Sequence, residues 1–297
     1  MIVSWNTRDL TLRCLAVLAG AVGALRFEAI VVDNGSTDGT PAAIRTQFPL
    51  VRLVEPGRNL GFSGGNNVGL TLVRGRFVCL LNPDTEPRTG ALAVLVAFLV
   101  AHQAVGAVGP RLLNPDGSEQ AVGFRFPTLA QIGLDFFPLG GRFAATSLNG
   151  RYPDMPRDRP FQIDFPLGAC ILARRAAIEA TGPLDEGFFM YSEEVDWCRR
   201  MQTAGWSIWC VPTAAVVHHS GQSVAQQSAR MYVELQRSRL RYYRRYHRPV
   251  FVAAARLLTR VAMLKEVVIS WRAYRRGALT RDRWRERTRA YGQIYRL

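Results

Sequence analysis

Residues Ala29 to Thr40 read Ala-Ile-Val-Val-Asp-Asn-Gly-Ser-Thr-Asp-Gly-Thr, an apolar run that ends in an acid and a turn. The β-branched residues of Ala29–Val32 predict a buried strand. Asn, Gly and Ser form turns, and a helix is expected from about Thr40. The stretch therefore predicts a strand, a turn and a helix in succession, with the carboxylate of Asp33 at the end of the strand.

The same pattern recurs on both sides of this stretch. Alternation of apolar strands with helix-period segments is typical of a mostly parallel sheet flanked by helices, an α/β Rossmann-like fold. Polar or Gly-rich residues follow each strand, so they are expected along the carboxyl edge of the sheet, where open α/β folds bind ligands. Strands are expected at Ile2–Trp5, Ala29–Val32, Val51–Val54 and Phe77–Leu81, and helices from about Leu10, Thr40 and Gly90.

The middle of the chain loses this regularity. Residues 110–166 are rich in Pro, Gly, Phe and Arg, and we expect them to form an irregular acceptor-side loop region. Regular structure is expected to resume with a strand at Gly168–Ala173 and a helix from about Glu193 that Gly205 ends. A pair of strands, Ile208–Val211 and Ala215–His218, is expected after it.

The positive charge of the chain is confined to its C-terminal part. The net charge is +15, but residues 1–229 carry 19 Arg against 19 acids, while residues 230–297 carry 18 Arg and one Lys against 4 acids. We therefore expect a catalytic domain at 1–229 and a basic helical extension at 230–297. Such an extension binds anionic lipid or nucleic acid, or is simply a solvated helical surface.

Within this extension, apolar residues between Pro249 and Trp271 recur at helical spacing and are interrupted by Arg256, Arg260, Lys265 and Glu266. This predicts an interfacial amphipathic helix, with helical dimerisation or covering of a domain as the alternative. Five cysteines without C-x-x-C spacing indicate reduced thiols. With no leader and no apolar run long enough to span a bilayer, we expect a cytoplasmic protein, peripheral on the inner membrane face.

Two polar segments are candidates for binding a nucleotide. Asp33 either shapes its turn or accepts a hydrogen bond from the N3–H group of uracil or thymine. The segment Arg58–Gly69 places glycines and the amides of Asn59 and Asn67 in front of a helix, where backbone N–H groups can approach phosphate oxygens and Arg58 adds charge. It lacks the G-x-G-x-x-G spacing of a dinucleotide site.

Acids and a histidine later in the chain are candidates for metal binding and proton transfer. Asp84 follows a strand after Asn82-Pro83 and either forms an Asx turn or binds a divalent metal together with substrate phosphates. His218 could supply an imidazole to the same metal. Glu193, Glu194 and Asp196 lie in the first turn of a helix. They either stabilise the helix by interacting with the positive end of its dipole or supply a general base.

Six motifs in this order resemble those of the family 2 glycosyltransferases, and specifically the rhamnosyltransferase-like branch, over about residues 1–225. They are Val-Ser-Trp-Asn, Val-Asp-Asn-Gly-Ser-Thr-Asp-Gly-Thr, Arg-Asn-Leu-Gly-Phe-Ser-Gly-Gly-Asn-Asn-Val-Gly, Leu-Asn-Pro-Asp, Tyr-Ser-Glu-Glu-Val-Asp-Trp-Cys-Arg-Arg and His-His-Ser-Gly-Gln-Ser.

The resemblance implies a GT-A fold and an inverting single displacement with Mg²⁺ or Mn²⁺ on the donor diphosphate. It implies a dTDP- or UDP-linked sugar as donor, and a glycan or lipid-linked acceptor in cell-surface polysaccharide synthesis. Roles follow for individual residues. Ser4, Trp5, Asp33 and Arg58 match nucleotide-binding positions, Asp84 matches the metal-binding acid of the D-x-D-type motif, His218 matches a later metal or diphosphate contact, and Glu194 matches the base.

Two departures from the family pattern concern the metal and the base. Asn82 replaces the first acid of D-x-D on the donor side, and Glu194 replaces the usual Asp, which leaves Glu193 and Asp196 as rival bases. A nucleotidyltransferase-like enzyme is one alternative, but the Gly-rich, Lys-bearing loop expected after its first strand is missing from Ser4–Thr7. A nucleic-acid-binding protein would use the basic extension and leave the acids unexplained. We therefore expect no nucleic-acid partner.

Overall fold

The computed structural model describes residues 1–139, 146–152, 155–220 and 228–297. The chain divides into two compact units: unit 1 holds residues 1–126, 154–189 and 193–223, and unit 2 holds residues 127–153, 190–192 and 224–297. A domain boundary between residues 229 and 230 stays a prediction.

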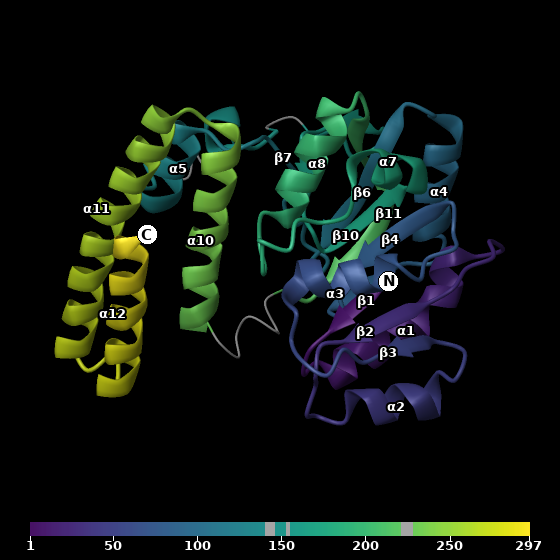
Figure 1. Cartoon of the computed structure of the whole chain (residues 1–297), viewed down its shortest axis with the longest axis horizontal. Helices are drawn as coiled ribbons and strands as arrows, with labels where there is room; N and C mark the ends of the chain where they lie inside the picture. Colours follow the sequence, from purple (N-terminus) through teal and green to yellow (C-terminus); the bar gives the residue numbers. More distant parts are fainter. Residues whose placement is uncertain (140–145, 153–154, 221–227) are drawn as a thin grey trace. The chain divides into compact units, whose positions relative to one another are not determined.

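A central sheet forms the middle of unit 1 (Figure 1). Its strand order is β3-β2-β1-β4-β10-β6-β11-β5, with β8 paired to β11. Parallel pairs join β1 to β2 and β4, β2 to β3, and β6 to β11, whereas β10 runs antiparallel between β4 and β6. The strands are β1 (Ile2–Ser4), β2 (Ile30–Asp33), β3 (Arg52–Val54), β4 (Phe77–Leu81), β5 (Thr85–Pro87), β6 (Val105–Leu113), β8 (Phe161–Gln162), β10 (Cys170–Arg174) and β11 (Ser207–His218).

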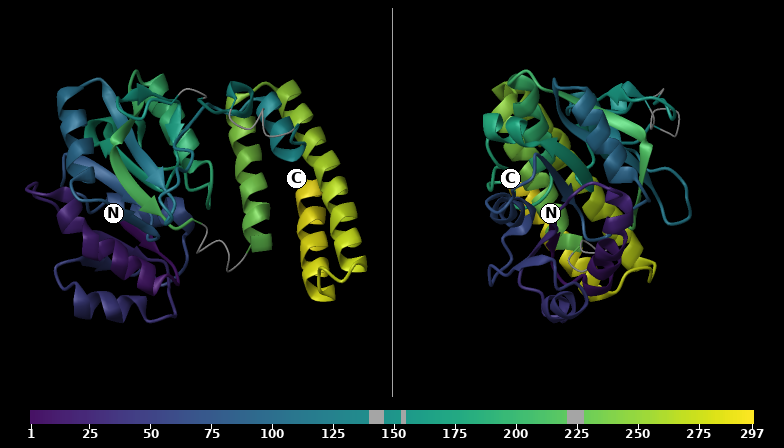
Figure 2. Two further views of the ribbon diagram at one scale, coloured as in Figure 1. Left: turned by 180° about the vertical axis from the view of Figure 1, so that it is seen from behind. Right: turned by 90° about the vertical axis from the view of Figure 1, so that its right-hand side faces the viewer.

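Helices cover both faces of this sheet, which Figure 2 shows from behind and from the side. α1 (Arg8–Val22) contacts α2 (Thr40–Gln47) and α4 (Ala91–Ala101) on one face. On the other face, α3 (Gly61–Leu70) contacts β1 and β2, while α7 (Arg175–Thr181) packs beside α8 (Glu193–Thr203). The sheet is therefore buried on both faces, and all four residues of β2 are buried, which explains the continuous apolar runs in the sequence.

Unit 2 consists mainly of helices. α10 (Ser228–Tyr246), α11 (Pro249–Arg275) and α12 (Arg281–Arg296) contact one another, most extensively α11 and α12, and α5 (Leu129–Phe136) packs on α11 (Figure 1). A short 3₁₀ helix, Ser147–Asn149, contacts α5. The predicted helical extension is present, with the Pro249–Trp271 segment inside α11. No helix among the described residues combines the length and the apolar character needed to cross a bilayer.

The structure corrects two predictions about regular elements. Ile208–Val211 and Ala215–His218 are not a pair of strands but parts of β11, which continues past a register irregularity between Val211 and Ala215. Such a bulge absorbs the Pro in this segment, since Pro cannot donate a ladder hydrogen bond.

The region 110–166 is also more regular than expected. It contains the end of β6, the helix α5 and a two-stranded sheet of β7 (Gly123–Phe124) and β9 (Phe165–Pro166). Residues 140–145 and 153–154 of this region lie outside the described residues. Its use as an acceptor-side loop stays a prediction.

Candidate active site

Strand pairing brings the predicted metal-binding residues together. Residues Thr85–Pro87 run antiparallel to Val216–His218, with Thr85 opposite His218. Asp84 immediately precedes this pairing, and its backbone carbonyl accepts a hydrogen bond from the N–H of His219 at 2.9 Å. As a result, Asp84 Oδ1 lies 3.5 Å from His218 Nε2, although the two residues are 134 positions apart. Both side chains are more than nine-tenths buried.

The contact between Asp84 and His218 is longer than a hydrogen bond, which joins such atoms at about 2.7 to 3.2 Å. The other ring nitrogen, His218 Nδ1, lies 2.9 Å from Oε1 of Gln120. A ring nitrogen and a carboxylate oxygen therefore converge without an optimal hydrogen bond between them, as two ligands of one cation do.

Chemically, this pair fits a divalent cation that takes most of its ligands from a substrate. A carboxylate with substrate phosphates is the usual donor set of Mg²⁺ and Mn²⁺, and imidazole adds a softer ligand. Among the described residues, no group of three or more His, Cys, Asp or Glu side chains could hold a metal alone. A cation at Asp84 and His218 would need oxygens from a diphosphate or from water.

A second cluster lies where β1 and β2 end. Asn6, which has a positive φ of 51°, accepts a hydrogen bond from Thr37 N and donates its own backbone N–H to Ser36 Oγ, so the two loops are joined. Asp33 is 1% exposed. Its Oδ2 accepts the N–H of Ser36 at 2.8 Å, whereas its Oδ1 is buried without a hydrogen-bond partner. A buried carboxylate oxygen of this kind is poised to accept a donor group from a ligand.

The other predicted nucleotide-binding residues of β1 differ in their settings. Ser4 is fully buried, and its hydroxyl lies 3.0 Å from Thr11 Oγ1 and 3.2 Å from Thr7 Oγ1 inside the first turn of α1. Trp5 is half-buried in the loop that follows β1. The Ser4 hydroxyl is thus used within the protein, while Trp5 retains exposed surface.

The structure corrects the prediction that the glycines of Arg58–Gly69 stand in front of a helix, because most of them lie inside α3. A Cβ on Gly65 would lie 2.7 Å from Val3 Cγ1, and one on Gly69 would lie 2.8 Å from Met1 Cε. These glycines therefore let α3 pack closely against the sheet. Only Gly61, with a φ of +74°, stands at the start of the helix, where a Cβ would collide with the carbonyl oxygen of Phe189.

The polar residues of this segment have distinct contacts. Asn59 Oδ1 accepts the N–H of Gly61 at 2.9 Å, in the turn that leads into α3. Both ends of the Asn67 amide bind the backbone of Leu184, and its Nδ2 also donates to Glu186. Arg58 is exposed and forms no ion pair within the described residues. Asn59 and Asn67 are neutral and bind the backbone, whereas the charged side chain of Arg58 is exposed and can contact a ligand.

The three acids of α8 lie in three different environments. Asp196 is fully buried and accepts a 2.8 Å hydrogen bond from Arg200 Nε. Glu193 is 5% exposed and its Oε2 is buried without a hydrogen-bond partner. Burial, and then the neighbouring charge of Glu194, raise the pKa of Glu193 well above its usual value. Glu194 is half-buried.

A short chain of contacts connects Glu194 to the segment that carries Asp84. A Cβ on Gly168 would lie 3.7 Å from Glu194 Cδ, which is ordinary van der Waals contact. The next residue, Ala169, accepts the N–H of Asn82 at 2.9 Å. Asn82 Oδ1 is itself buried without a hydrogen-bond partner. The segment Gly168–Ala169 therefore lies between the start of α8 and the Asn82–Asp84 turn.

Gln120 is a structurally important residue that the sequence did not single out. Gln120 follows the Asn114–Gly117 turn, but nothing in the local sequence indicates a contact with a residue 98 positions later. The i,i+4 spacing of Asp196 and Arg200 does indicate their ion pair. Residues 221–223 of the last motif lie outside the described residues.

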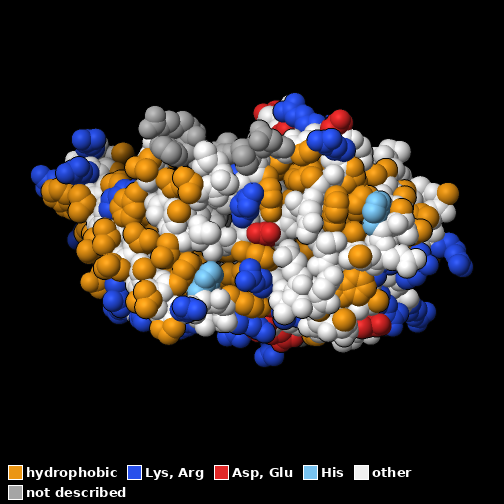
Figure 3. All heavy atoms as spheres, turned by 90° about the horizontal axis from the view of Figure 1, so that it is seen from above, with side chains coloured by type: hydrophobic (Ala, Val, Ile, Leu, Met, Phe, Trp, Pro, Cys, Tyr) orange, Lys and Arg blue, Asp and Glu red, His pale blue; other side chains and the backbone are white. Residues whose placement is uncertain are grey.

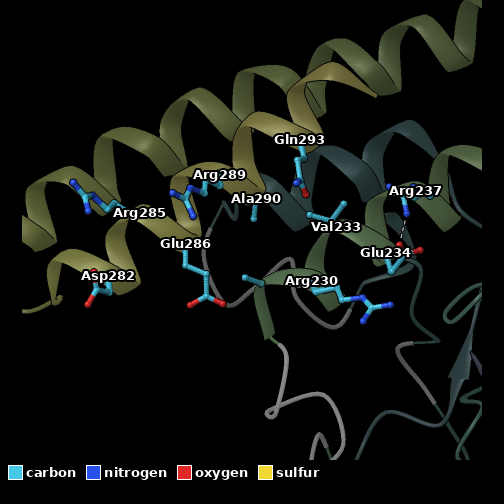
Figure 4. Close-up of a pocket in the computed structure, with 11 residues that line it drawn as sticks. Arg230, Val233, Glu234, Arg237, Asp282, Arg285, Glu286, Arg289, Ala290 and Gln293 are labelled. Atoms are coloured by element: carbon cyan, nitrogen blue, oxygen red, sulfur yellow. Dashed lines mark hydrogen bonds and ion pairs between the residues drawn. The ribbon is translucent and has the colours of Figure 1, made fainter. Parts of the chain in front are cut away.

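Unit 2 has a separate pocket of about 670 Å³ between α10 and α12 (Figure 4). Arg230 and Arg237 approach it from α10, and Arg285 and Arg289 from α12. Acids lie among them, and Glu234 forms an ion pair with Arg237. None of the predicted site residues lines this pocket.

Comparison with known proteins adds independent information. The model of the family described as "Glycosyl transferase family 2" matches residues 1–182. An N-acetylglucosaminyl-diphospho-decaprenol L-rhamnosyltransferase of Mycobacterium tuberculosis is 33% identical over 215 residues, which cover 67% of this chain and 69% of that protein. The low-salt glycan biosynthesis hexosyltransferase Agl10 of Haloferax volcanii is 27% identical over 70% of this chain and 64% of its own length.

Solved structures support the fold. The mannosyltransferase PcManGT from Pyrobaculum calidifontis, in complex with GDP-Man and Mn²⁺, has a TM-score of 0.58 at 18% identity. The match covers 99% of this chain and 83% of that protein. GalNAc-T7 with UDP, GalNAc and Mn²⁺ has a TM-score of 0.56 at 17% identity, over 73% of this chain and 42% of that protein. The predicted GT-A fold is confirmed, and the nucleotidyltransferase-like and nucleic-acid-binding alternatives are not favoured.

Proposed function

The chain belongs to glycosyl transferase family 2, and we propose that it transfers a sugar, rhamnose in the first instance, from a dTDP- or UDP-linked donor to a lipid-linked glycan acceptor. Sugar transfer in polysaccharide synthesis follows from the family and from the relatives. The donor and acceptor are proposed by analogy with the mycobacterial rhamnosyltransferase. The observation that carries the proposal is the approach of Asp84 to His218, with Glu194 beside Gly168, the neighbour of Ala169, which bonds Asn82.

We propose that Asp33 and Arg58 hold the nucleotide. The unpartnered Oδ1 of Asp33 accepts the N3–H of the base, and Trp5 offers its exposed ring surface beside it. Arg58 adds positive charge toward the donor phosphates. The Asn82 amide completes the donor side, next to Asp84. Donor contacts by Ser4, Asn59 and Asn67 remain predictions from the motifs alone, because their polar groups are used within the protein.

Asp84 and His218 would hold the donor diphosphate through a divalent cation, and we favour Mn²⁺ because of the imidazole ligand. When bound, such a cation offsets the negative charge that develops on the leaving diphosphate. The protein supplies the geometry: the β5–β11 pairing fixes both ligands before the donor arrives. Replacing Asp84 with Ala should weaken donor binding in the presence of Mn²⁺. Calorimetry that gives equal donor affinity with and without Mn²⁺ in the wild type would remove the metal from the proposal.

Glu194 is the proposed general base, which takes the proton of the acceptor hydroxyl as the hydroxyl oxygen attacks the anomeric carbon and inverts it. The residue is half-buried, with its Oε2 atom buried, and its exposed part leaves it within reach of a substrate hydroxyl. Glu193 is disfavoured because burial, and then the charge of Glu194, raise the pKa of its carboxyl well above its usual value, and Asp196 because Arg200 engages it.

The test of the base is a panel of nucleotide-sugars assayed for donor hydrolysis and transfer, followed by Glu194→Gln with the best donor. A general base contributes about 10²–10⁴-fold to the rate. We expect a loss of this size in kcat with donor affinity unchanged. A Glu194→Gln enzyme that turns over within a few-fold of the wild type would exclude Glu194 as the base.

We also propose that α11 places the enzyme on an anionic membrane surface at the inner face. Its outward side carries a row of apolar residues with exposures of 47 to 80%. Arginines flank them in the sequence, at Arg256, Arg260 and Arg272. Figure 3 shows apolar and basic side chains next to each other on the face that it draws, which is the one seen from above Figure 1. The combination suits the boundary between headgroups and acyl chains. The row consists of Val250, Leu257, Val261, Leu264, Val268 and Trp271.

Vesicle flotation tests this surface. Full-length protein should float with vesicles that contain phosphatidylglycerol, and much less with phosphatidylcholine alone. The double variant Leu257→Gln, Leu264→Gln should lose this binding, while Leu50→Gln, at a residue that is 98% exposed in unit 1, should not. Flotation of the double variant at the wild-type level would refute the membrane proposal. A change from dimer to monomer would instead identify the row as a contact between two copies.

A further inference from the structure

The side-chain amide of Gln120 forms hydrogen bonds with His218 through both its nitrogen and its oxygen. Its Nε2 has two hydrogens, which it donates to the backbone carbonyl of His218 and to Asn114 Oδ1, each at 2.8 Å, while Ser220 Oγ lies 3.1 Å from the same nitrogen. Its Oε1 lies 2.9 Å from His218 Nδ1. A backbone carbonyl only accepts hydrogen bonds, so the NH₂ group must face it, and the oxygen of the amide must face the ring.

This orientation decides which ring nitrogen of His218 carries the proton. An amide oxygen has no hydrogen to give, so a hydrogen bond at 2.9 Å requires the N–H at Nδ1. In the neutral ring, Nε2 then has only its lone pair, and it is Nε2 that lies 3.5 Å from Asp84 Oδ1. A lone pair facing a carboxylate repels it unless a cation lies between them. In metal sites, a hydrogen bond to the far nitrogen sets ring orientation and tautomer in the same way.

Gln120 also ties together parts of the chain that are distant in sequence. It follows the Asn114–Gly117 turn, next to the bridge between Leu113 and Glu119. Its two bonds to His218 join this turn to the end of β11. Ser220 is a weaker partner of His218 Nδ1 than Gln120 is, since its Oγ lies 3.2 Å from this nitrogen and Gln120 Oε1 lies 2.9 Å from it.

We propose that Gln120 is a positioning residue that holds His218 in the Nδ1–H tautomer, with Nε2 presented as a ligand beside Asp84. The inference rests on the proposed metal site and names the residue that prepares it before metal and donor arrive. It does not make Gln120 a catalytic residue, because Gln120 acts through His218.

Two variants of Gln120 distinguish the effect of its hydrogen-bond acceptor from the effect of its size. Gln120→Met keeps the approximate length of the side chain and removes the oxygen that faces Nδ1. Gln120→Glu restores an acceptor at this place. The same Gln→Met change at Gln162, an exposed residue of β8, is the matched control for the substitution itself. Thermal unfolding shows whether each variant is folded.

The first measurement is nitrogen-15 NMR of histidine-labelled, metal-free protein in alkaline buffer, where long-range couplings identify the protonated ring nitrogen. We expect the Nδ1–H form of His218 in the wild type and in Gln120→Glu. Gln120→Met should give a mixture of tautomers. A wild-type ring with its proton on Nε2 would overturn the proposal, and this result does not depend on any metal or activity.

The second measurement is Mn²⁺ binding followed by electron paramagnetic resonance, with Mn²⁺ alone and with Mn²⁺ plus UDP. Loss of an outer partner of a metal ligand weakens affinity by about 10–100-fold. We expect a loss of this size for Gln120→Met, a change of only a few-fold for Gln120→Glu, and none for Gln162→Met. Folded Gln120→Met that binds Mn²⁺ like the wild type would refute the positioning role. A wild type that binds no Mn²⁺ would refute the metal site, and the tautomer measurement would still decide the role of Gln120.

Discussion

Replacing Asp196 with Asn tests whether this carboxylate supports the helix that carries Glu194 or takes part in the reaction. Asp196 is fully buried, and Arg200, its partner one turn later, has a side chain that is 17% exposed. The guanidinium of Arg200 also donates to three backbone carbonyls, those of Thr181, Gly182 and Pro183. The ion pair thus connects α8 to the end of α7 and the residues after it.

The size of the effect follows from these contacts. Removing one charge of a buried pair costs about 3–5 kcal/mol, because the remaining charge is left in the interior. The three carbonyls keep Arg200 partly satisfied, and the Asn amide can still accept one hydrogen bond. We therefore expect the low end, about 3 kcal/mol. For a chain of this size, that corresponds to a fall in Tm of about 6 °C.

The assay combines urea unfolding, followed by circular dichroism, with kcat measured well below the Tm. We expect Asp196→Asn to lose stability and to keep its kcat within a few-fold. Glu179→Gln is the matched control, since Arg175 and Glu179 form an i,i+4 pair that is exposed, with side chains 47% and 62% accessible. It should change stability by less than about 0.5 kcal/mol. An Asp196→Asn enzyme with wild-type stability and a 100-fold lower kcat would make Asp196 a catalytic residue.

Two further substitutions test the packing of α3 and the burial of Glu193. Gly65→Ala should unfold at a lower temperature than the wild type, because overpacking against Val3 costs about 1–3 kcal/mol and exceeds the helix-propensity gain of about 1 kcal/mol. Gly20→Ala in α1, where a Cβ meets nothing closer than 3.8 Å, should be at least as stable as the wild type, and equal stability of the two variants would contradict the packing argument. Glu193→Gln should stabilise the protein more at pH 8 than at pH 5, because the unfolded carboxyl ionises from about pH 4.5 while burial raises the folded pKa, so the wild type loses stability as the pH rises. Urea unfolding that gives the same stability difference at both pH values would exclude this account of Glu193.

The sequence predicted the first four strands of the sheet to within about two residues, for a physical reason. Strands buried on both faces have continuous apolar runs, and polar turns at their ends leave little freedom for the boundaries. β11 was more difficult, because Pro212 and Thr213 interrupt its apolar pattern. Only the parallel pairing with β6 shows that the strand continues through a bulge.

The candidate site was harder to predict because its chemistry depends on distant contacts. Glycines in front of a helix and glycines inside a closely packed helix have the same composition, and only the position of Val3 beneath Gly65 distinguishes them. Asp84 and His218 could be recognised from their places at strand ends. The pairing of β5 with β11, which brings them together, involves strands that are far apart in sequence. Gln120 has no local signal at all.

In the metal site proposed above, the small number of protein ligands would link metal binding to donor binding. Asn82 stands where the family pattern has a first acid, so in the part of the chain that the structure describes the proposed site has one carboxylate and one imidazole. Most of the coordination shell must then come from the donor diphosphate and from water. Each ligand raises the affinity for the other by the same factor, as linkage requires. In the proposed site, a tautomer fixed by Gln120 would matter more than in one with several carboxylates, because no third His, Cys, Asp or Glu side chain joins the pair among the described residues.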